Sequence, residues 1–102
     1  MADRLHLLPR HRAMLAGLLR EHLPGVEVWA YGSRVNGRSH DGSDLDVVLR
    51  SPELAETDAR KLADFVEALR NSNIPFLVDV HDWARLPKEF HREIERSHVI
   101  LQ

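Results

Sequence analysis

Residues 28–49 read VWAYGSRVNGRSHDGSDLDVVL, two apolar runs separated by a polar loop. The first run, 28–31, is rich in aromatic and β-branched residues, and the second, 45–49, is apolar at every position except Asp46. Both runs predict strands, so the loop carries the chain from the end of one strand to the start of the next.

Gly32 and Ser33 occupy the point at which the first strand ends and the backbone has to turn. Glycine has no side chain to keep another group away, and free N–H groups together with a serine hydroxyl can point at phosphate oxygens. A Gly-Ser pair on its own is more often an ordinary turn. Its value as a phosphate-binding candidate depends on the acidic residues farther along the chain.

Three aspartates lie in or beside apolar segments. Asp44 and Asp46 are two residues apart, and side chains with that spacing in a strand face the same side. Asp79 stands in the apolar run 76–80, where burial of an unbound carboxylate is costly. Neighbouring carboxylates repel one another unless a cation lies between them, and hard oxygen ligands suit Mg²⁺. The three side chains are therefore candidate metal ligands.

The order Gly32-Ser33, ten residues, Asp44-x-Asp46 and a separate Asp79 resembles the signature of the DNA polymerase β-type nucleotidyltransferases. With GSRVNG at 32–37 and SDLD at 43–46, the short chain is similar to the minimal nucleotidyltransferase (MNT) proteins within that superfamily. Those proteins are often the antitoxin half of a pair with a HEPN-domain toxin. The resemblance extends from about residue 10 to about residue 98.

The resemblance implies a reaction in which a nucleoside triphosphate and an acceptor hydroxyl give a nucleotidylated acceptor and pyrophosphate. It further implies ATP as the donor and a tyrosine of the partner HEPN toxin as the acceptor. The product would be an AMPylated and thereby silenced toxin.

The resemblance also implies site residues. Asp44, Asp46 and Asp79 would be the catalytic residues and would hold two Mg²⁺ ions, an arrangement that stabilises the attacking and leaving oxygens. Asp79 is the best candidate to draw the proton from the acceptor hydroxyl. Gly32, Ser33 and Arg34 would bind the phosphates of the nucleotide, with Arg34 neutralising their charge.

Other functions compete with this interpretation. A small-molecule nucleotidyltransferase of the aminoglycoside-modifying kind would share the motif, but it uses additional sequence to hold its substrate. A non-enzymatic antitoxin would neutralise its toxin by occlusion, although the intact acids and Gly-Ser pair argue against a vestigial site. A regulatory nucleotide-binding module is a further alternative. An enzyme would release pyrophosphate from the nucleotide, whereas such a module would not.

Length and composition restrict the broad class. The chain has 102 residues, 43% hydrophobic and 29% charged, which indicates a single globular domain spanning 1–102. It has no cysteine and no apolar run of membrane-spanning length, so we expect a cytoplasmic protein without disulfides or thiolate zinc sites. The net charge of −2 lacks the basic excess of nucleic-acid-binding proteins, and we expect no direct binding of nucleic acid.

The apolar periodicity predicts an α/β (α+β) fold, a small mixed β-sheet covered by helices, as in the polymerase β-like nucleotidyltransferases. The acids of the second and third strands would then meet above one edge of the sheet. The expected elements are a helix from Pro9 to the Pro24-Gly25 turn, a strand Val26–Tyr31, a strand Leu45–Leu49, a helix that begins between Glu53 and Asp58 and ends at Asn71, a strand Ile74–Val80 and a helix Pro87–His98.

Several polar and aromatic residues near the motif have no assigned role. The spacing of the seven histidines does not predict a zinc site. Asp41 and Asp82 are expected to be turn residues, and Trp29 is expected in the core. The roles left open are those of Arg38, His40, His81 and Trp83.

The small size of the chain has a consequence for its partner. A domain of this length has no room for a separate acceptor-binding domain, so a macromolecular acceptor would supply its own docking surface. The surfaces to examine first are the terminal segment Pro87–Gln102, with Phe90, Ile94 and Ile100, and the exposed side of the N-terminal helix. The alternative for Phe90 and Ile94 is that they close the core of the chain itself.

Overall fold

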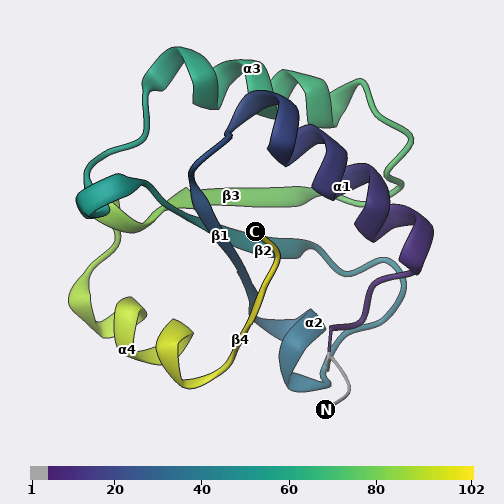
Figure 1. Ribbon diagram of the computed structural model, residues 1–102. Helices are drawn as coiled ribbons and strands as arrows, with labels where there is room; N and C mark the ends of the chain where they lie inside the picture. Colours follow the sequence, from purple (N-terminus) through teal and green to yellow (C-terminus); the bar gives the residue numbers. More distant parts are fainter. Residues whose placement is uncertain (1–4) are drawn as a thin grey trace.

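The computed structural model describes residues 5–102, which form a four-stranded sheet with helices on both faces (Figure 1). This arrangement confirms the expected mixed sheet covered by helices. The elements, in chain order, are α1 Pro9–His22, β1 Glu27–Tyr31, α2 Ser33–Asn36, β2 Leu45–Arg50, the 3₁₀ turn η1 Pro52–Leu54, α3 Ala59–Arg70, β3 Val78–Asp82, the 3₁₀ turn η2 Trp83–Arg85, α4 Lys88–Arg96 and β4 His98–Ile100.

The strand order in the sheet is β3-β2-β1-β4. β1 pairs antiparallel with β2 and with β4, whereas β2 and β3 run parallel. The parallel pair needs a crossover, which α3 provides between β2 and β3. In the register of that pair Asp46 lies opposite Asp79, so the fold brings together two carboxylates that are 33 residues apart in the sequence.

The main core lies between α1, α3 and one face of the sheet. In Figure 1 these two helices run together on the same side of the strands. Alternate residues of each strand point to this face, as the two-residue period of a strand requires. The buried side chains that meet here include Leu15 and Leu19 of α1, Val28 and Ala30 of β1, Val47 and Leu49 of β2, and Phe65 and Leu69 of α3.

A second, smaller core lies on the opposite face, under α4. It consists of Trp29, Val48, Trp83 and Ile94, all buried, so the expectation that Trp29 belongs to the core is confirmed and Trp83 joins it there. The Trp29 and Trp83 rings meet edge to face at 5.6 Å. Arg50 extends over both rings, with its guanidinium carbon 4.0 Å and 4.6 Å from their centroids. This cation–π packing lets α4 cover one end of the face with few aliphatic residues.

The helices α1 and α3 begin at residues that favour the start of a helix. Pro9 is at the first turn of α1, where its missing N–H leaves no hydrogen bond unmade. Asp58 caps α3, and its carboxylate accepts hydrogen bonds from the backbone N–H groups of Arg60 and Lys61, both at 3.0 Å.

The expected third strand was wrong in its position. It was expected at Ile74–Val80, but β3 is Val78–Asp82. Pro75 has no N–H to donate to a strand ladder, and pairing with β2 begins only where Leu45 donates to the carbonyl of Leu77 at 2.9 Å.

The C-terminal segment also differs from the expectation. The last helix was expected to reach His98, but α4 ends at Arg96 and β4 follows at once as the sheet edge beside β1. Gln102 fixes this end, because its side-chain amide donates to the carbonyls of Leu23 and Val26, both at 2.9 Å. The apolar residues after α4 therefore complete the sheet.

The part of the chain that the structure describes contains no helix long and apolar enough to cross a bilayer.

The difference between Phe65 and Phe90 gives a direct test of where the core lies. Phe65 is fully buried, whereas Phe90 on α4 is 54% exposed. We predict that Phe65→Ala lowers the free energy of unfolding by about 3–5 kcal/mol. The matched change Phe90→Ala should alter it by no more than about 0.5 kcal/mol. Urea denaturation measures both, and equal losses would mean that Phe90 closes the core.

Candidate active site

The carboxylate of Asp46 lies against the backbone of Gly32 at the end of β1. A Cβ atom built on Gly32 would come within 2.5 Å of Asp46 Oδ2, a separation that real Cβ atoms do not adopt. Gly32 also has φ 82° and ψ −152°, a conformation that other residues rarely adopt. Glycine is therefore strongly favoured here, because any other residue would be strained and would displace the Asp46 carboxylate of the neighbouring strand.

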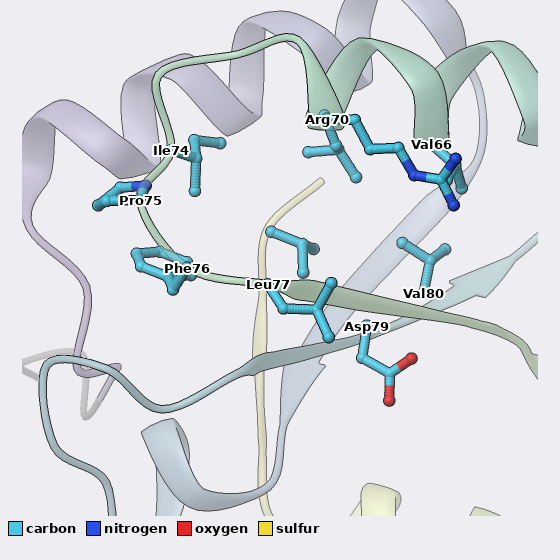
Figure 2. A pocket seen from close by; sticks show the side chains of 10 residues that line it. Val66, Arg70, Ile74, Pro75, Phe76, Leu77, Asp79 and Val80 are labelled. Atoms are coloured by element: carbon cyan, nitrogen blue, oxygen red, sulfur yellow. The ribbon is translucent and has the colours of Figure 1, made fainter.

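Asp46, Asp79 and His81 form one cluster on the sheet face opposite α1 and α3. Their nearest ligand atoms all lie within 4.8 Å of one another. His81 Nε2 is 3.1 Å from Asp79 Oδ2, and the two residues share a side of β3 because they are two apart. Figure 2 shows the Asp79 side chain pointing away from α3, whereas Val80 points toward Val66 and Arg70. The cluster is accessible, with 48% of the Asp79 side chain exposed.

Asp44 lies outside this cluster. It precedes the first residue of β2 and is exposed, so the alternation of a strand does not fix its direction. It is still close enough to act on Asp46 electrostatically. The structure thus brings Asp46 and Asp79 together, as the sequence predicted, adds His81, and leaves Asp44 at the rim.

The carboxylates in and beside the cluster repel one another. Burial raises the pKa of Asp46, the carboxylates of Asp79 and Asp44 raise it further, and His81 acts in the opposite direction. A raised carboxyl pKa means that ionised Asp46 is unfavourable for the folded state. This cost develops as the pH rises from the ordinary carboxyl pKa through the raised one.

Tyr31 is a member of the site that the sequence reasoning did not identify. It pairs with Asp46 across β1 and β2, and its ring centroid is 6.5 Å from that of His81. Burial, with the nearby Asp46 and Asp79, raises the pKa of Tyr31 to about 12. Its hydroxyl is therefore protonated at neutral pH. The register of β1 with β2 was the signal that could have found it.

Arg34 has a different surrounding from the phosphate contact expected of it. It is 3% exposed, and its guanidinium donates to the carbonyls of His6 at 2.7 Å, Asp41 at 2.9 Å and Ser43 at 3.0 Å. The guanidinium also lies over the Phe76 ring, 4.1 Å from its centroid. Burial lowers the pKa of Arg34, and the nearby acids oppose that shift. In this conformation the buried Arg34 side chain stabilises the loop through these hydrogen bonds.

The loop after α2 is held by further local contacts. His6 lies beside it, with Nδ1 2.6 Å from Ser39 Oγ and Nε2 3.2 Å from Asp41 Oδ1. Within the loop, His40 Nδ1 accepts from the N–H of Gly42 at 3.1 Å. These contacts stabilise the turn that contains His40 and Asp41, in keeping with the expectation that Asp41 is a turn residue.

Asp82 is more than the turn residue that was expected. It is 6% exposed, and its carboxylate accepts from the N–H of Thr57 at 2.9 Å and from the Thr57 hydroxyl at 2.8 Å. The Thr57 hydroxyl is in turn 2.7 Å from that of Ser51. Asp82 thus ties the segment before α3 to the end of β3, and no single-sequence pattern pointed to this role.

A hollow of about 600 Å³ lies on the α3 side of β3, at the edge of the sheet (Figure 2). Apolar side chains dominate its lining, including Val66, Ile74 and Leu77. Only Asp79 belongs both to this lining and to the acidic cluster. The hollow is therefore distinct from the cluster, which faces the other side of the sheet.

The cluster fits a divalent cation. The space beside Gly32 that a Cβ atom would fill holds a carboxylate instead, and the donor set of two carboxylates and an imidazole is one that metal ions use. Mutual repulsion of the acids is relieved when a cation lies between them.

Comparison with known proteins connects this geometry to a family. The nucleotidyltransferase domain family matches residues 13–101. A probable protein adenylyltransferase MntA of Haemophilus influenzae is 36% identical over 90 residues, which cover 88% of this chain and 77% of that protein.

Solved structures show the same fold. A toxin–antitoxin structure with AMP-PNP superposes with a TM-score of 0.71 at 19% identity, over 93% of this chain and 73% of the other. A mutant of the toxin–antitoxin MntA-HpeT gives a TM-score of 0.71 at 16% identity, over 89% and 72%. At these identities the likeness concerns the fold alone.

The contact between Gly32 and Asp46 generates a prediction. Gly32→Ala should lower the free energy of unfolding by about 1–3 kcal/mol through backbone strain, and it should also displace the Asp46 carboxylate and weaken cation binding. Gly25→Ala is the matched control, because Gly25 also has a positive φ of 80° but a Cβ there meets no described atom within 4 Å.

Urea denaturation and isothermal titration with Mg²⁺ measure the two effects. Both variants should lose stability, and only Gly32→Ala should lose cation binding. Unchanged Mg²⁺ affinity in a folded Gly32→Ala protein would mean that Asp46 does not depend on this contact.

Proposed function

The chain belongs to the nucleotidyltransferase domain family, and from that premise we propose that it is a Mg²⁺-dependent protein adenylyltransferase with the role of an antitoxin. It would transfer AMP from ATP to a tyrosine hydroxyl of a partner HEPN-domain toxin and so neutralise it. The observation that carries the proposal is the cluster of Asp46 and Asp79 on an open sheet face, next to the Gly32-Ser33 turn.

Asp46 and Asp79 would hold the divalent cations, with Asp44 contributing from the rim. Bound cations would supply charge stabilisation to the attacking and leaving oxygens of an in-line displacement. The chain itself holds the two carboxylates together at an electrostatic cost, which the raised pKa of Asp46 reflects. A site whose acids are already gathered is preorganised for binding, because the ligands do not have to be collected from solvent.

Gly32 and Ser33 would receive the phosphates of ATP. The turn has no side chain at Gly32, and α2 begins at the next residue, Ser33, so the phosphates would meet the turn on the side that the Asp46 carboxylate leaves free. Arg34 supports this turn by binding three carbonyls, including that of Ser43 one residue before Asp44. The direct phosphate contact expected of Arg34 would require its guanidinium to leave those acceptors.

Asp79 would accept the proton of the acceptor hydroxyl. It is the more accessible carboxylate of the cluster, at the edge strand of the sheet, where a second macromolecule can approach. Tyr31 is a poor acceptor in its own site, because its pKa of about 12 keeps the hydroxyl protonated and its ring is half-buried. The acceptor would therefore come from outside the chain.

The exposed apolar residues indicate where a partner can bind. Ile94, one of the residues considered for the partner surface, lies on the inner side of α4, where it is buried and belongs to the second core. Phe90 and Ile100 are 54% and 56% exposed and stay available. A partner that covers them would explain why a small domain keeps large apolar side chains in solvent.

The first test combines activity with stability. We predict that Asp46→Asn lowers transfer of AMP by on the order of 100-fold or more, because charge stabilisation at the reacting oxygens is lost. The same change should raise the melting temperature in the absence of divalent cations, since it removes an unfavourable carboxylate. Mass spectrometry of the product of the neighbouring open reading frame, incubated with ATP and Mg²⁺, measures transfer.

The comparison variant is Asp64→Asn, which removes a carboxylate from α3 on the other side of the sheet and should leave transfer unchanged. A toxin that stays unmodified and active while a small molecule is modified would favour the aminoglycoside-type alternative. A toxin that is neutralised without added AMP would favour occlusion.

A second test separates binding from chemistry. Asp79→Asn should leave the affinity for ATP largely unchanged and lower the single-turnover rate by about 10²–10⁴-fold, the contribution typical of a general base. Nucleotide titration and rapid-quench measurements give the two quantities separately. Loss of ATP affinity with a normal rate at saturation would contradict the assignment of Asp79 to the acceptor.

A further inference from the structure

His81 extends the acidic cluster with a nitrogen donor. Its imidazole was left without a role by the sequence, and the structure places it beside Asp79 and within 4.8 Å of an Asp46 oxygen. We propose that His81 is a direct ligand of the cation and that it makes the site favour Mn²⁺ over Mg²⁺. The inference rests on the proposed function only in taking the cluster to be the cation site.

The position of His81 is set by the sheet. Asp79 and His81 are two residues apart on β3, so their side chains leave the same face, and Asp46 faces them from the parallel neighbour. The Tyr31 ring is a neighbour of the imidazole, with its centroid 6.5 Å away. The His81 side chain is 38% exposed, so a hydrated ion can reach it without rearrangement of the core.

The distance between His81 and Asp79 fits two ligands of one ion. Two donor atoms at right angles, each about 2.1 Å from a metal ion, lie about 3.0 Å apart. His81 Nε2 and Asp79 Oδ2 are 3.1 Å apart. The nitrogen that faces the carboxylate is therefore placed as a neighbouring ligand would be, with the Asp46 carboxylate on the same side.

The chemistry of the donors decides which ion is favoured. Mg²⁺ prefers oxygen ligands and retains several waters, whereas imidazole suits transition metal ions. Mn²⁺ accepts carboxylates as readily as Mg²⁺ does, and it lies within the series of first-row ions that bind mixed nitrogen and oxygen sites. An imidazole added to two carboxylates thus raises the affinity for Mn²⁺ more than the affinity for Mg²⁺.

A competing explanation gives His81 a purely supporting role. In that case Nε2 carries a proton and donates a hydrogen bond to Asp79, and the imidazole orients the carboxylate without touching the ion. The two explanations differ in one observable. Direct coordination places a nitrogen nucleus on the metal, and a supporting hydrogen bond does not.

The experiment titrates the full chain with Mn²⁺ and follows it by electron paramagnetic resonance, with Mg²⁺ as competitor. Pulsed measurements on the bound ion detect coordinated nitrogen, and protein labelled with ¹⁵N-histidine distinguishes histidine from backbone nitrogen without any substitution. We expect a histidine nitrogen on Mn²⁺ in the wild type and its loss in His81→Gln. His22→Gln on α1 is the control, because it removes a histidine from the other side of the sheet.

His81→Gln should lower the affinity for Mn²⁺ by about 10-fold or more, since even partners outside the ligand shell contribute that much, and should change the affinity for Mg²⁺ little. Circular dichroism checks the fold of the variant, and the labelled wild type gives the answer if the variant fails to fold. Bound Mn²⁺ without a histidine nitrogen, an unchanged Mn²⁺ to Mg²⁺ ratio in His81→Gln, or no Mn²⁺ binding would overturn the inference.

A parallel assay of AMP transfer keeps the two proposals separate. Transfer that continues while histidine is absent from the ion would leave the proposed function intact and reduce His81 to a supporting role. Coordination of Mn²⁺ by His81 without any transfer of AMP would contradict the proposed function and leave the metal assignment standing.

Discussion

The approach of the Asp46 carboxylate to the backbone of Gly32 is the constraint on which the site depends. The contact exists because β1 and β2 are antiparallel neighbours and Gly32 comes directly after Tyr31, the partner of Asp46 in the register. It leaves no room for a Cβ atom. The same contact therefore fixes both the Gly32 turn and the position of the Asp46 carboxylate, and a change at either residue alters both.

The parallel pairing of β2 with β3 adds the second acid at an electrostatic cost. Asp46 and Asp79 are held side by side by the register, and the pKa of Asp46 is raised by burial and by its neighbours. The fold tolerates this because its stability comes from elsewhere, mainly from the core under α1 and α3. Active sites commonly retain such unfavourable arrangements, and the gain appears when a cation binds.

Much of this arrangement could be predicted from the sequence, and the exceptions have physical causes. The apolar runs predicted the strands that carry Asp46 and Asp79, and the register of β2 with β3 sets these two carboxylates opposite each other. The two-residue period of a strand does not fix the direction of Asp44, because that residue stands before the first residue of β2. Arg34 was expected at phosphate because its charge was visible in the sequence, whereas the carbonyls that hold it come from segments whose approach only the fold determines.

The two faces of the sheet have different contents, because the main core lies on one face and the acidic cluster on the other. One face is closed by two long helices, so it carries the core. The other face is closed by α4 only at the end where Arg50 packs over Trp29 and Trp83, and its remaining half carries the acids. This half lies beside the edge strand β3, and under the proposed function an acceptor that brings its own binding surface would reach Asp79 from this side.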